Sequence, residues 1–291
     1  MSAVSEDVLG EDSNQTKKFG PYLVFRELFP ESEIPYSGVG PLVYQGEAVR
    51  DDYEEDYGPY SAVPGGSTAS ILTYPYQAAL LVRSDGKFYQ ICGGVLVSKR
   101  KVLTAAHCVD LGLTYYVMLG VSDLRDSTSK YIQFIQVSRR ILHRSYKNYQ
   151  DYDIAMLTLS YPARINRRTR IVRLGSYIDT RPTNRCSVSG WGRSETGSGY
   201  VLKAGRLRMM TQTRCTAEWY RLTNRYLLGS REVCAVAQDA STCSGDSGGP
   251  LVCSGRLAGL VSWGNGDCTP GTPGVFTRIA RLRFWIYARL F

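Results

Sequence analysis

The stretch GDSGGP, residues 245–250, decides the fold of this chain and is the natural place to begin. A serine between glycines predicts, by itself, no more than a turn, because glycine adopts backbone conformations that other residues avoid. Glycine also lets a backbone N–H approach a ligand with no side chain in the way, as the stabilisation of an oxyanion requires. The stretch therefore predicts either a plain turn or the nucleophile loop of a hydrolase.

Two other short segments supply the partners that a nucleophilic serine needs. A histidine stands in TAAHC, residues 104–108, and an aspartate begins DIAML, residues 153–157. A serine hydroxyl is a weak nucleophile until a neighbouring base takes its proton, and histidine suits that task because its pKa lies near neutrality. An aspartate orients the imidazole and stabilises its cation. Each residue alone is typical of a structural role, but His107, Asp153 and Ser247 together predict a catalytic triad.

The three segments resemble those of the chymotrypsin family of serine proteases, and the resemblance covers essentially all of residues 63–291. It implies an all-β fold of two six-stranded antiparallel β-barrels with a C-terminal helix. It also implies a serine endopeptidase that forms an acyl-enzyme, with the backbone N–H groups of Gly245 and Ser247 as its oxyanion hole. The match to Asp-Ile-Ala favours Asp153 over Asp151, two residues earlier.

Two competing interpretations are disfavoured. His143, the other of the two histidines, lies in a basic run typical of a surface, so we expect it to be structural. An esterase of another fold usually places its serine before the aspartate and the histidine, at a Gly-X-Ser-X-Gly elbow. The order of the three segments here is the reverse.

The rest of the chain is typical of an all-β protein. From about Ala78 onward, short runs rich in β-branched and aromatic residues recur between turn signals, as in a barrel or a sandwich. These runs lie at residues 78–83, 94–97, 115–119, 132–137, 155–159, 187–190, 250–253 and 257–263. Only residues 279–290 read as a helix, with apolar residues on one face.

The eight cysteines predict a disulfide framework formed outside the reducing cytosol. A zinc site would need close Cys-X-X-Cys or cysteine–histidine spacings, which do not occur, so we expect no metal and no other cofactor. The family resemblance implies the pairs Cys92–Cys108, Cys186–Cys253, Cys215–Cys234 and Cys243–Cys268. We expect a secreted protein whose signal peptide has been removed, because no basic and apolar leader is visible at the N-terminus.

Charge divides the chain in two. Residues 1–62 hold 13 acidic and 4 basic side chains, a net charge of about −9, whereas residues 63–291 hold 13 acidic and 31 basic ones, about +18. The first part is rich in proline and contains no cysteine. We therefore expect a largely extended acidic prosegment over residues 1–62, an activation peptide, followed by a protease domain over residues 63–291.

The family resemblance implies a zymogen, in which an activating protease frees an N-terminus whose amine pairs with the aspartate before the serine. Here the new terminus aligns with Val63 and its partner is Asp246. Cleavage would follow Ala62 rather than the usual basic residue, and Pro64 also departs from the family pattern. A cut after Arg50 is an alternative, but it would leave an acidic terminus suited only to preliminary trimming.

The resemblance also locates the pocket for the side chain before the scissile bond. Its base lies six residues before the serine and is an aspartate in trypsin-like members, but it is Ser241 here. The other pocket positions are Thr242, Ser262, Trp263, Gly264 and Gly274. An open, uncharged slot favours a large apolar side chain, whose burial is worth about 1.5–3 kcal/mol, so we predict cleavage after Tyr, Phe, Leu or Trp. Asp239 or Asp267 could instead favour a basic residue.

Two of the pocket residues have a further expected role. Ser262 is expected to donate a hydrogen bond to the carboxylate of Asp153. Trp263 is expected to line the substrate groove, and core packing is the alternative role for its indole.

Arginines gather in four groups, at residues 139–144, 164–173, 206–208 and 278–283. Such groups predict either a solvated basic face or a site for a heparin-like polyanion, and the acidic prosegment is a further partner of the right charge. Interleaved aromatics typical of a nucleic-acid motif are absent, so we expect no specific nucleic acid. An alternative function is a catalytically silent polyanion-binding module on the same fold.

The expected partners of the protease are protein or peptide substrates, an activating protease and serine-protease inhibitors. No run of 18 apolar residues predicts a membrane span.

Overall fold

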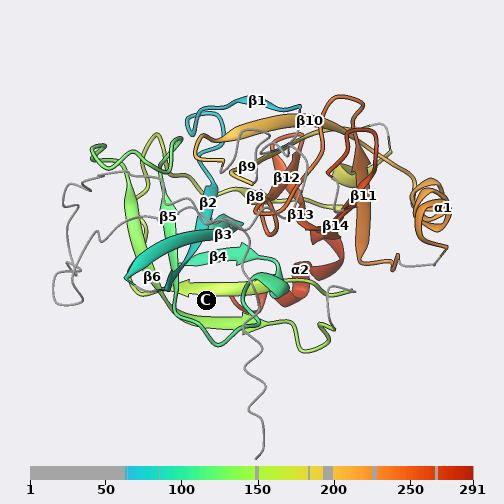
Figure 1. Cartoon of the computed structure of the whole chain (residues 1–291). Helices are drawn as coiled ribbons and strands as arrows, with labels where there is room; N and C mark the ends of the chain where they lie inside the picture. The colour runs from blue at the N-terminus through green and yellow to red at the C-terminus, as the bar shows by residue number, and fades with distance from the viewer. Residues whose placement is uncertain are drawn as a thin grey trace, which may run out of the picture.

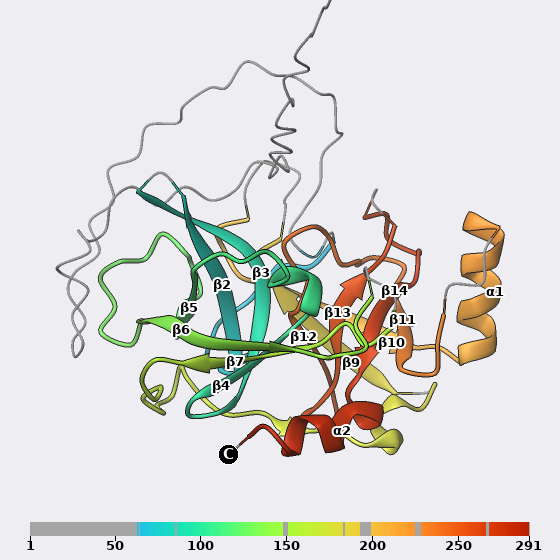
Figure 2. The ribbon, with the colours of Figure 1, turned by 90° about the horizontal axis from the view of Figure 1, so that it is seen from below.

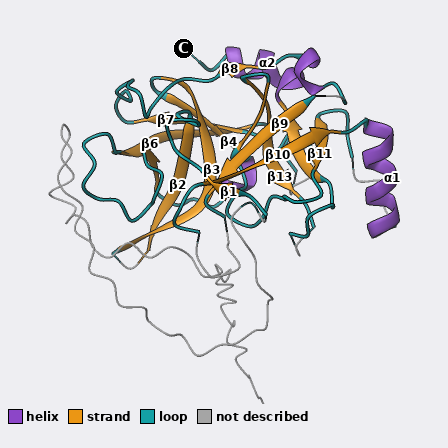
Figure 3. Cartoon of the chain, turned by 90° about the horizontal axis from the view of Figure 1, so that it is seen from above, coloured by secondary structure: helices purple, strands orange, loops and turns teal. Residues whose placement is uncertain are grey.

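Strands make up most of the regular secondary structure in this computed structural model, which describes residues 63, 65–84, 86–147, 151–182, 184–192, 199–224, 228–265 and 268–290. The predicted prosegment therefore lies outside the described residues, as do Pro64 and Asp267. In Figure 3 the strands fill the two halves of the molecule, and the two α-helices lie at its periphery. No helix among the described residues is both long enough and apolar enough to cross a membrane.

The first half is a closed barrel of six antiparallel strands, with the order β2-β3-β4-β7-β6-β5 (Figure 1). The strands are β2 (Gln77–Ser84), β3 (Lys87–Ser98), β4 (Lys101–Thr104), β5 (Tyr115–Leu119), β6 (Gln133–Leu142) and β7 (Ala155–Leu159). Strand β2 closes the ring because it pairs with both β3 and β5. Leu80, Val117 and Leu157 are buried inside it, since alternate residues of each strand face the interior.

The second half is also a ring of six antiparallel strands. It contains β9 (Arg185–Gly190), β10 (Lys203–Met209), β11 (Glu232–Val236), β12 (Pro250–Cys253), β13 (Arg256–Trp263) and β14 (Gly274–Arg278). Strand β9 closes this ring because it pairs with both β10 and β12. Two short strands add to the outside, β1 (Ser67–Thr68) beside β10 and β8 (Arg173–Leu174) parallel to β13. The predicted fold class, two six-stranded barrels with a C-terminal helix, is confirmed.

The C-terminal helix α2 spans Ile279–Tyr287, close to the predicted range. It lies under the junction of the two barrels in Figure 2. Its buried residues Leu282 and Ile286 belong to a core that also contains Leu103 of the first barrel and Leu260 of the second. The helix therefore helps to fix one barrel relative to the other.

The prediction that residues 279–290 hold the only helix is wrong, because α1 spans Gln212–Thr223. This helix buries only Cys215 and Trp219, one turn apart, so its sequence lacks the wide apolar face from which a packed helix is recognised. Its start is stabilised locally instead, since the side chain of Thr211 accepts a backbone hydrogen bond from the first turn.

Candidate active site

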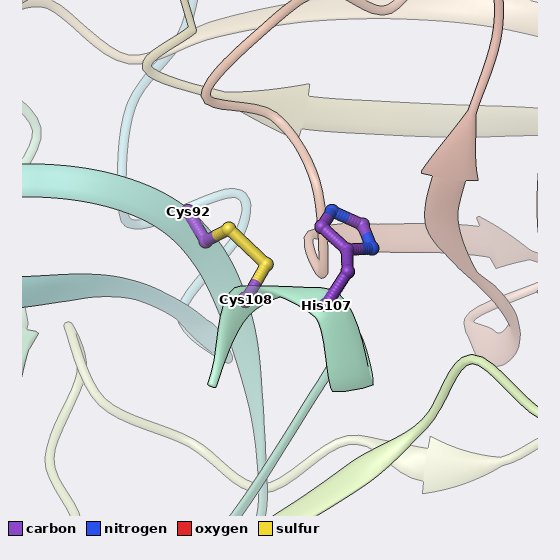
Figure 4. A group of neighbouring side chains, drawn as sticks. All are labelled: Cys92, His107 and Cys108. Carbon is purple, nitrogen blue, oxygen red and sulfur yellow. A yellow bond between two sulfur atoms is a disulfide. The ribbon is translucent and has the colours of Figure 1, made fainter. Parts of the chain in front are cut away.

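His107 lies in a short 3-10 helix, Ala106–Cys108, that follows β4 directly. Figure 4 shows its imidazole beside the disulfide between Cys92 and Cys108. One nitrogen and the two sulfurs lie within 4.8 Å of one another, a spacing compatible with a metal site. Both sulfurs are bonded to each other, however, and therefore offer no thiolate ligand. The disulfide instead ties the turn that carries His107 to strand β3.

The imidazole of His107 and the carboxylate of Asp153 are in direct contact. Nδ1 of His107 lies 2.8 Å from Oδ2 of Asp153, and the backbone N–H of His107 donates to Oδ1 at 3.0 Å. Ser262 donates its hydroxyl to Oδ2 at 2.6 Å, the contact expected from the resemblance, and Thr277 donates to the Asp153 carbonyl at 2.7 Å. Asp153 is only 2% exposed. Its buried charge is therefore surrounded by donors that hold it in one orientation.

A one-residue irregularity in the sheet brings Ser262 to this carboxylate. Strand β13 pairs with β14 through Val261 and Trp263, and the register shifts between these two residues. A bulge of this kind re-aims the intervening side chain. Asp151, the sequence competitor of Asp153, turns elsewhere, because its carboxylate accepts a hydrogen bond from Arg231 at 2.8 Å.

His143 has a structural environment, as expected. Its ring stacks on Tyr152 at 4.3 Å between centroids, and its Nδ1 accepts the backbone N–H of Ser145 at 3.1 Å. Burial lowers its pKa, and the positive charges of Arg289, Arg144 and Arg231 lower it further. The lowered pKa favours the neutral ring, whose contacts are with Tyr152 and Ser145.

The loop that carries Ser247 packs against the segment that carries His107. The backbone N–H of Gly93 in β3 donates to the carbonyl of Ser247 at 2.7 Å. Gly248 has a φ of +75°, and a Cβ added there would overlap Thr104 Oγ1, three residues before His107. Only glycine fits this position, so the GDSGGP stretch brings the serine loop of the second barrel against the histidine turn of the first.

Gly245 lies on the same loop, with a φ of +92°. Its carbonyl accepts a hydrogen bond of 2.9 Å from the side-chain amide of Gln90, which also donates to Cys92 at 2.8 Å. Gln90, in strand β3, therefore holds the loop that bears the candidate oxyanion donors. The sequence offered no signal for it, because a glutamine in a strand has many structural uses.

Asp246 is fully buried and faces three backbone donors. Oδ1 accepts the N–H of Gly192 at 2.9 Å, and Oδ2 accepts those of Cys243 at 3.1 Å and Val63 at 3.2 Å. A Cβ on Gly190 or Gly192 would overlap this carboxylate or come within van der Waals contact of it. Burial raises the pKa of Asp246 to about 6, although the three hydrogen bonds oppose the rise. The expected partners Val63 and Asp246 are thus in contact.

The predicted pocket residues fall on neighbouring segments. Ser241 and Thr242 are each 8% exposed, and the Ser241 hydroxyl donates to the Thr242 carbonyl at 3.3 Å. A Cβ on Gly274 would lie 3.1 Å from Thr242 Oγ1, whereas one on Gly264 would meet no atom within 4 Å. The space beside Gly264 is therefore open.

Trp263 is held by the ring of Trp219, which the sequence marks as a chymotrypsin-like residue, and by a carboxylate that the sequence did not single out. Its ring packs edge-on against Trp219 of α1, with 4.7 Å between centroids. Its Nε1 donates to the carboxylate of Glu232 at 3.0 Å, and Gly229 donates its backbone N–H to the other oxygen at 2.7 Å. An acidic residue in the otherwise apolar stretch EVCAV, residues 232–236, was the available signal.

All eight cysteines are paired as the family resemblance implied, and the described residues contain no free cysteine. The disulfides are Cys92–Cys108, Cys186–Cys253, Cys215–Cys234 and Cys243–Cys268. The last one joins the segment after the pocket base to the segment before Gly274.

Known proteins share this fold and much of this sequence. The profile of the Trypsin family matches residues 63–286. Human kallikrein-14 is 38% identical over 231 residues, 76% of this chain and 82% of the relative, and dog anionic trypsin is 32% identical over 255 residues, 86% and 96% of the two chains. The structure of neuropsin, a serine protease expressed in the limbic system of mouse brain, is similar with a TM-score of 0.68 and 34% identity, and the match covers 78% of this chain and 99% of that one. The chain therefore belongs to the trypsin family and is a serine endopeptidase that acts on protein substrates.

Proposed function

We propose that this endopeptidase is a secreted enzyme, made as a zymogen, that cleaves after large apolar residues with His107, Asp153 and Ser247 as its catalytic triad. The observation that carries the proposal is the 2.8 Å contact between His107 Nδ1 and Asp153 Oδ2. A carboxylate only accepts hydrogen bonds, so Nδ1 carries a proton, and in the neutral imidazole Nε2 then carries none. That tautomer is the one in which the imidazole acts as a base.

The chemistry follows from this arrangement. Nε2 of His107 takes the hydroxyl proton of Ser247 while the serine oxygen attacks the scissile carbonyl. The backbone N–H groups of Gly245 and Ser247 stabilise the oxyanion, and loss of one such donor typically costs about 3–4 kcal/mol of transition-state stabilisation. The imidazolium, stabilised by Asp153, then protonates the leaving amine, and water releases the acyl group by the same steps in reverse order.

Labelling of Ser247 by an organophosphate tests the triad and separates it from the alternative of a silent polyanion-binding module. Stoichiometric labelling of the processed protein is expected, with none in a His107→Ala variant. A processed, folded protein that resists the reagent would contradict the proposal. The intact His107–Asp153 contact supports the active enzyme over the silent module.

The proposed specificity rests on the pocket base. Ser241 is buried and uncharged, so the pocket base does not supply the carboxylate that a basic side chain needs. A panel of peptides that differ only in the residue before the scissile bond tests this point. Preferred hydrolysis after Tyr, Phe, Leu or Trp is expected, and preference for Arg or Lys would overturn it.

The zymogen proposal rests on Val63, which is fully buried against Asp246. In the uncut chain Val63 has a φ of +43°, a strained conformation for a β-branched residue. Cleavage after Ala62 by an activating protease removes this constraint and converts the N–H into an ammonium group beside the carboxylate. We therefore propose residues 1–62 as prosegment and 63–291 as protease domain. N-terminal sequencing of the active enzyme is expected to begin at Val63, and any other start contradicts the assignment.

The remaining proposed properties concern location and partners. Four disulfides support secretion, because such bonds persist in oxidising compartments. Serine-protease inhibitors are proposed as partners because they would occupy the same site as a substrate. A heparin-like polyanion is proposed because Lys130, Arg167 and Arg168 all lie within 5.7 Å of the Tyr131 ring centroid, and the described part of the chain pairs none of them with an acid. Salt-dependent retention on heparin tests this, and elution below physiological salt contradicts it.

A further inference from the structure

The described residues contain one buried carboxylate near the site that the triad and the activation contact do not use. Glu232, the first residue of β11, is 3% exposed. It accepts hydrogen bonds from two neutral donors, Trp263 Nε1 at 3.0 Å and the backbone N–H of Gly229 at 2.7 Å. The neighbouring guanidinium of Arg231 pairs with Asp151 instead. A buried carboxylate with only neutral partners is costly for the fold, and such groups are found preferentially at functional sites.

Two indoles lie side by side here, and it is the Trp263 indole that donates to Glu232. Trp219 and Trp263 pack edge to face at 4.7 Å, but the Trp219 Nε1 is buried and has no hydrogen-bond partner among the described residues. The carboxylate therefore acts on Trp263 alone, and the Trp219 ring closes the other side. An indole held both by a charge-assisted hydrogen bond and by an edge-on ring has little freedom to rotate.

Trp263 directly follows Ser262, which donates to Asp153 at 2.6 Å. Its side chain is partly exposed, unlike those of Ser262 and Glu232. We propose that Glu232 is a positioning residue for extended peptide substrates, because it fixes the Trp263 indole as a rigid wall of the groove that leads to Ser247. This inference rests on the proposed protease site and adds a specificity determinant to it.

The proposal predicts a dependence on substrate length. A substrate that contains only the residue before the scissile bond is held by the pocket, whereas a peptide extended by three further residues on that side also runs along the groove wall. In Glu232→Gln the side chain that accepts the Trp263 hydrogen bond loses its charge. The amide nitrogen of the glutamine then faces the backbone N–H of Gly229, so two donors face each other. For the extended substrate we expect KM to rise about tenfold with kcat within twofold, because the lost contact binds the ground state and the transition state equally. KM for the short substrate should not change.

Glu218→Gln is the matched control, since Glu218 is a partly exposed acid on α1 that pairs with Arg221. It should leave both substrates unaffected. The melting temperature of Glu232→Gln should stay close to that of the natural chain, because removal of the buried charge offsets the lost hydrogen bond from Gly229. Equal losses on both substrates, or no loss on either, would overturn the positioning role.

A second measurement does not depend on catalysis. Two indoles in close contact give an exciton couplet in circular dichroism. Trp219→Phe should abolish this couplet, which assigns it to the pair of Trp219 and Trp263. Glu232→Gln should weaken the couplet, because Trp263 is released, whereas Glu218→Gln should preserve it. If the natural chain cleaves neither substrate, the proposed function fails, and the couplet still decides whether Glu232 positions Trp263. An unchanged couplet in Glu232→Gln would refute the inference.

Discussion

Cleavage before Val63 should change how the stability of the protease domain depends on pH. In the uncut chain Asp246 is fully buried and meets only neutral N–H groups, and burial raises its pKa from 3.8 to about 6. A folded-state pKa above the unfolded value favours the protonated carboxyl. The contribution of Asp246 to the free energy of unfolding is therefore fully present below the unfolded pKa and is lost as pH rises through about 6. A shift of this size corresponds to about 3 kcal/mol.

In the cut chain the same carboxylate faces an ammonium group. Pairing with this cation should remove most of the loss of stability near pH 6. The free energies of unfolding of the cut and uncut forms should therefore diverge as pH rises from 4 to 8. The amine's own pKa is raised by the pairing, and its contribution should fade only as pH rises through that folded value, above about 8.

Thermal unfolding of a Ser247→Ala protein, compared before and after cleavage in the same buffers, measures the difference. The mutation prevents self-digestion without touching Asp246. The cut form should be the more stable at pH 8 by about 3 kcal/mol, and the two forms should converge near pH 4. Parallel stability curves across this range would refute the pairing of Val63 with Asp246.

Three substitutions test other parts of the site. Gly248→Ala should destabilise the fold by at least about 2 kcal/mol, because its Cβ overlaps Thr104 at a positive φ, and chemical denaturation measures this loss. Ser262→Ala should lower kcat about tenfold with little change in KM, since it removes a 2.6 Å hydrogen bond to Asp153, and steady-state kinetics against Ser262→Thr checks it. Ser241→Asp should move the preferred residue before the scissile bond to Arg or Lys, and an unchanged profile would show that Ser241 is not the pocket base.

Much of the fold was predictable because its strongest signals are local. The runs at residues 115–119, 155–159 and 250–253 coincide with β5, β7 and β12, since each is a short apolar run that ends at a turn or loop. Strands β10 and β14 contain Lys203, Arg206 and Gly274, residues with weak strand preference. Each forms by pairing with two other strands, β10 with β9 and β11 and β14 with β11 and β13, which periodicity does not report.

The candidate site divides in the same way. His107, Asp153 and Ser247 stand in segments whose residue types identify them, and the structure brings their loops together. Gln90 and Glu232 act through contacts with Gly245 and Trp263 across separate strands or loops. Gln90 has no distinctive neighbours in the sequence, and the acid in the apolar stretch EVCAV stands out without showing what it contacts, so only the three-dimensional arrangement identifies their roles.

The contact between Gly93 and Ser247 has a mechanical consequence. His107 belongs to the first barrel and Ser247 to a loop of the second, while Asp153 accepts hydrogen bonds from both barrels, so the atoms proposed to react meet where the two barrels join. A shear of less than an ångström between these barrels is enough to misalign proton transfer, although every strand stays intact. Moderate hydrostatic pressure, or a ligand bound between the two barrels, should therefore abolish activity well before the protein unfolds. Removal of the pressure or the ligand should restore the rate at once.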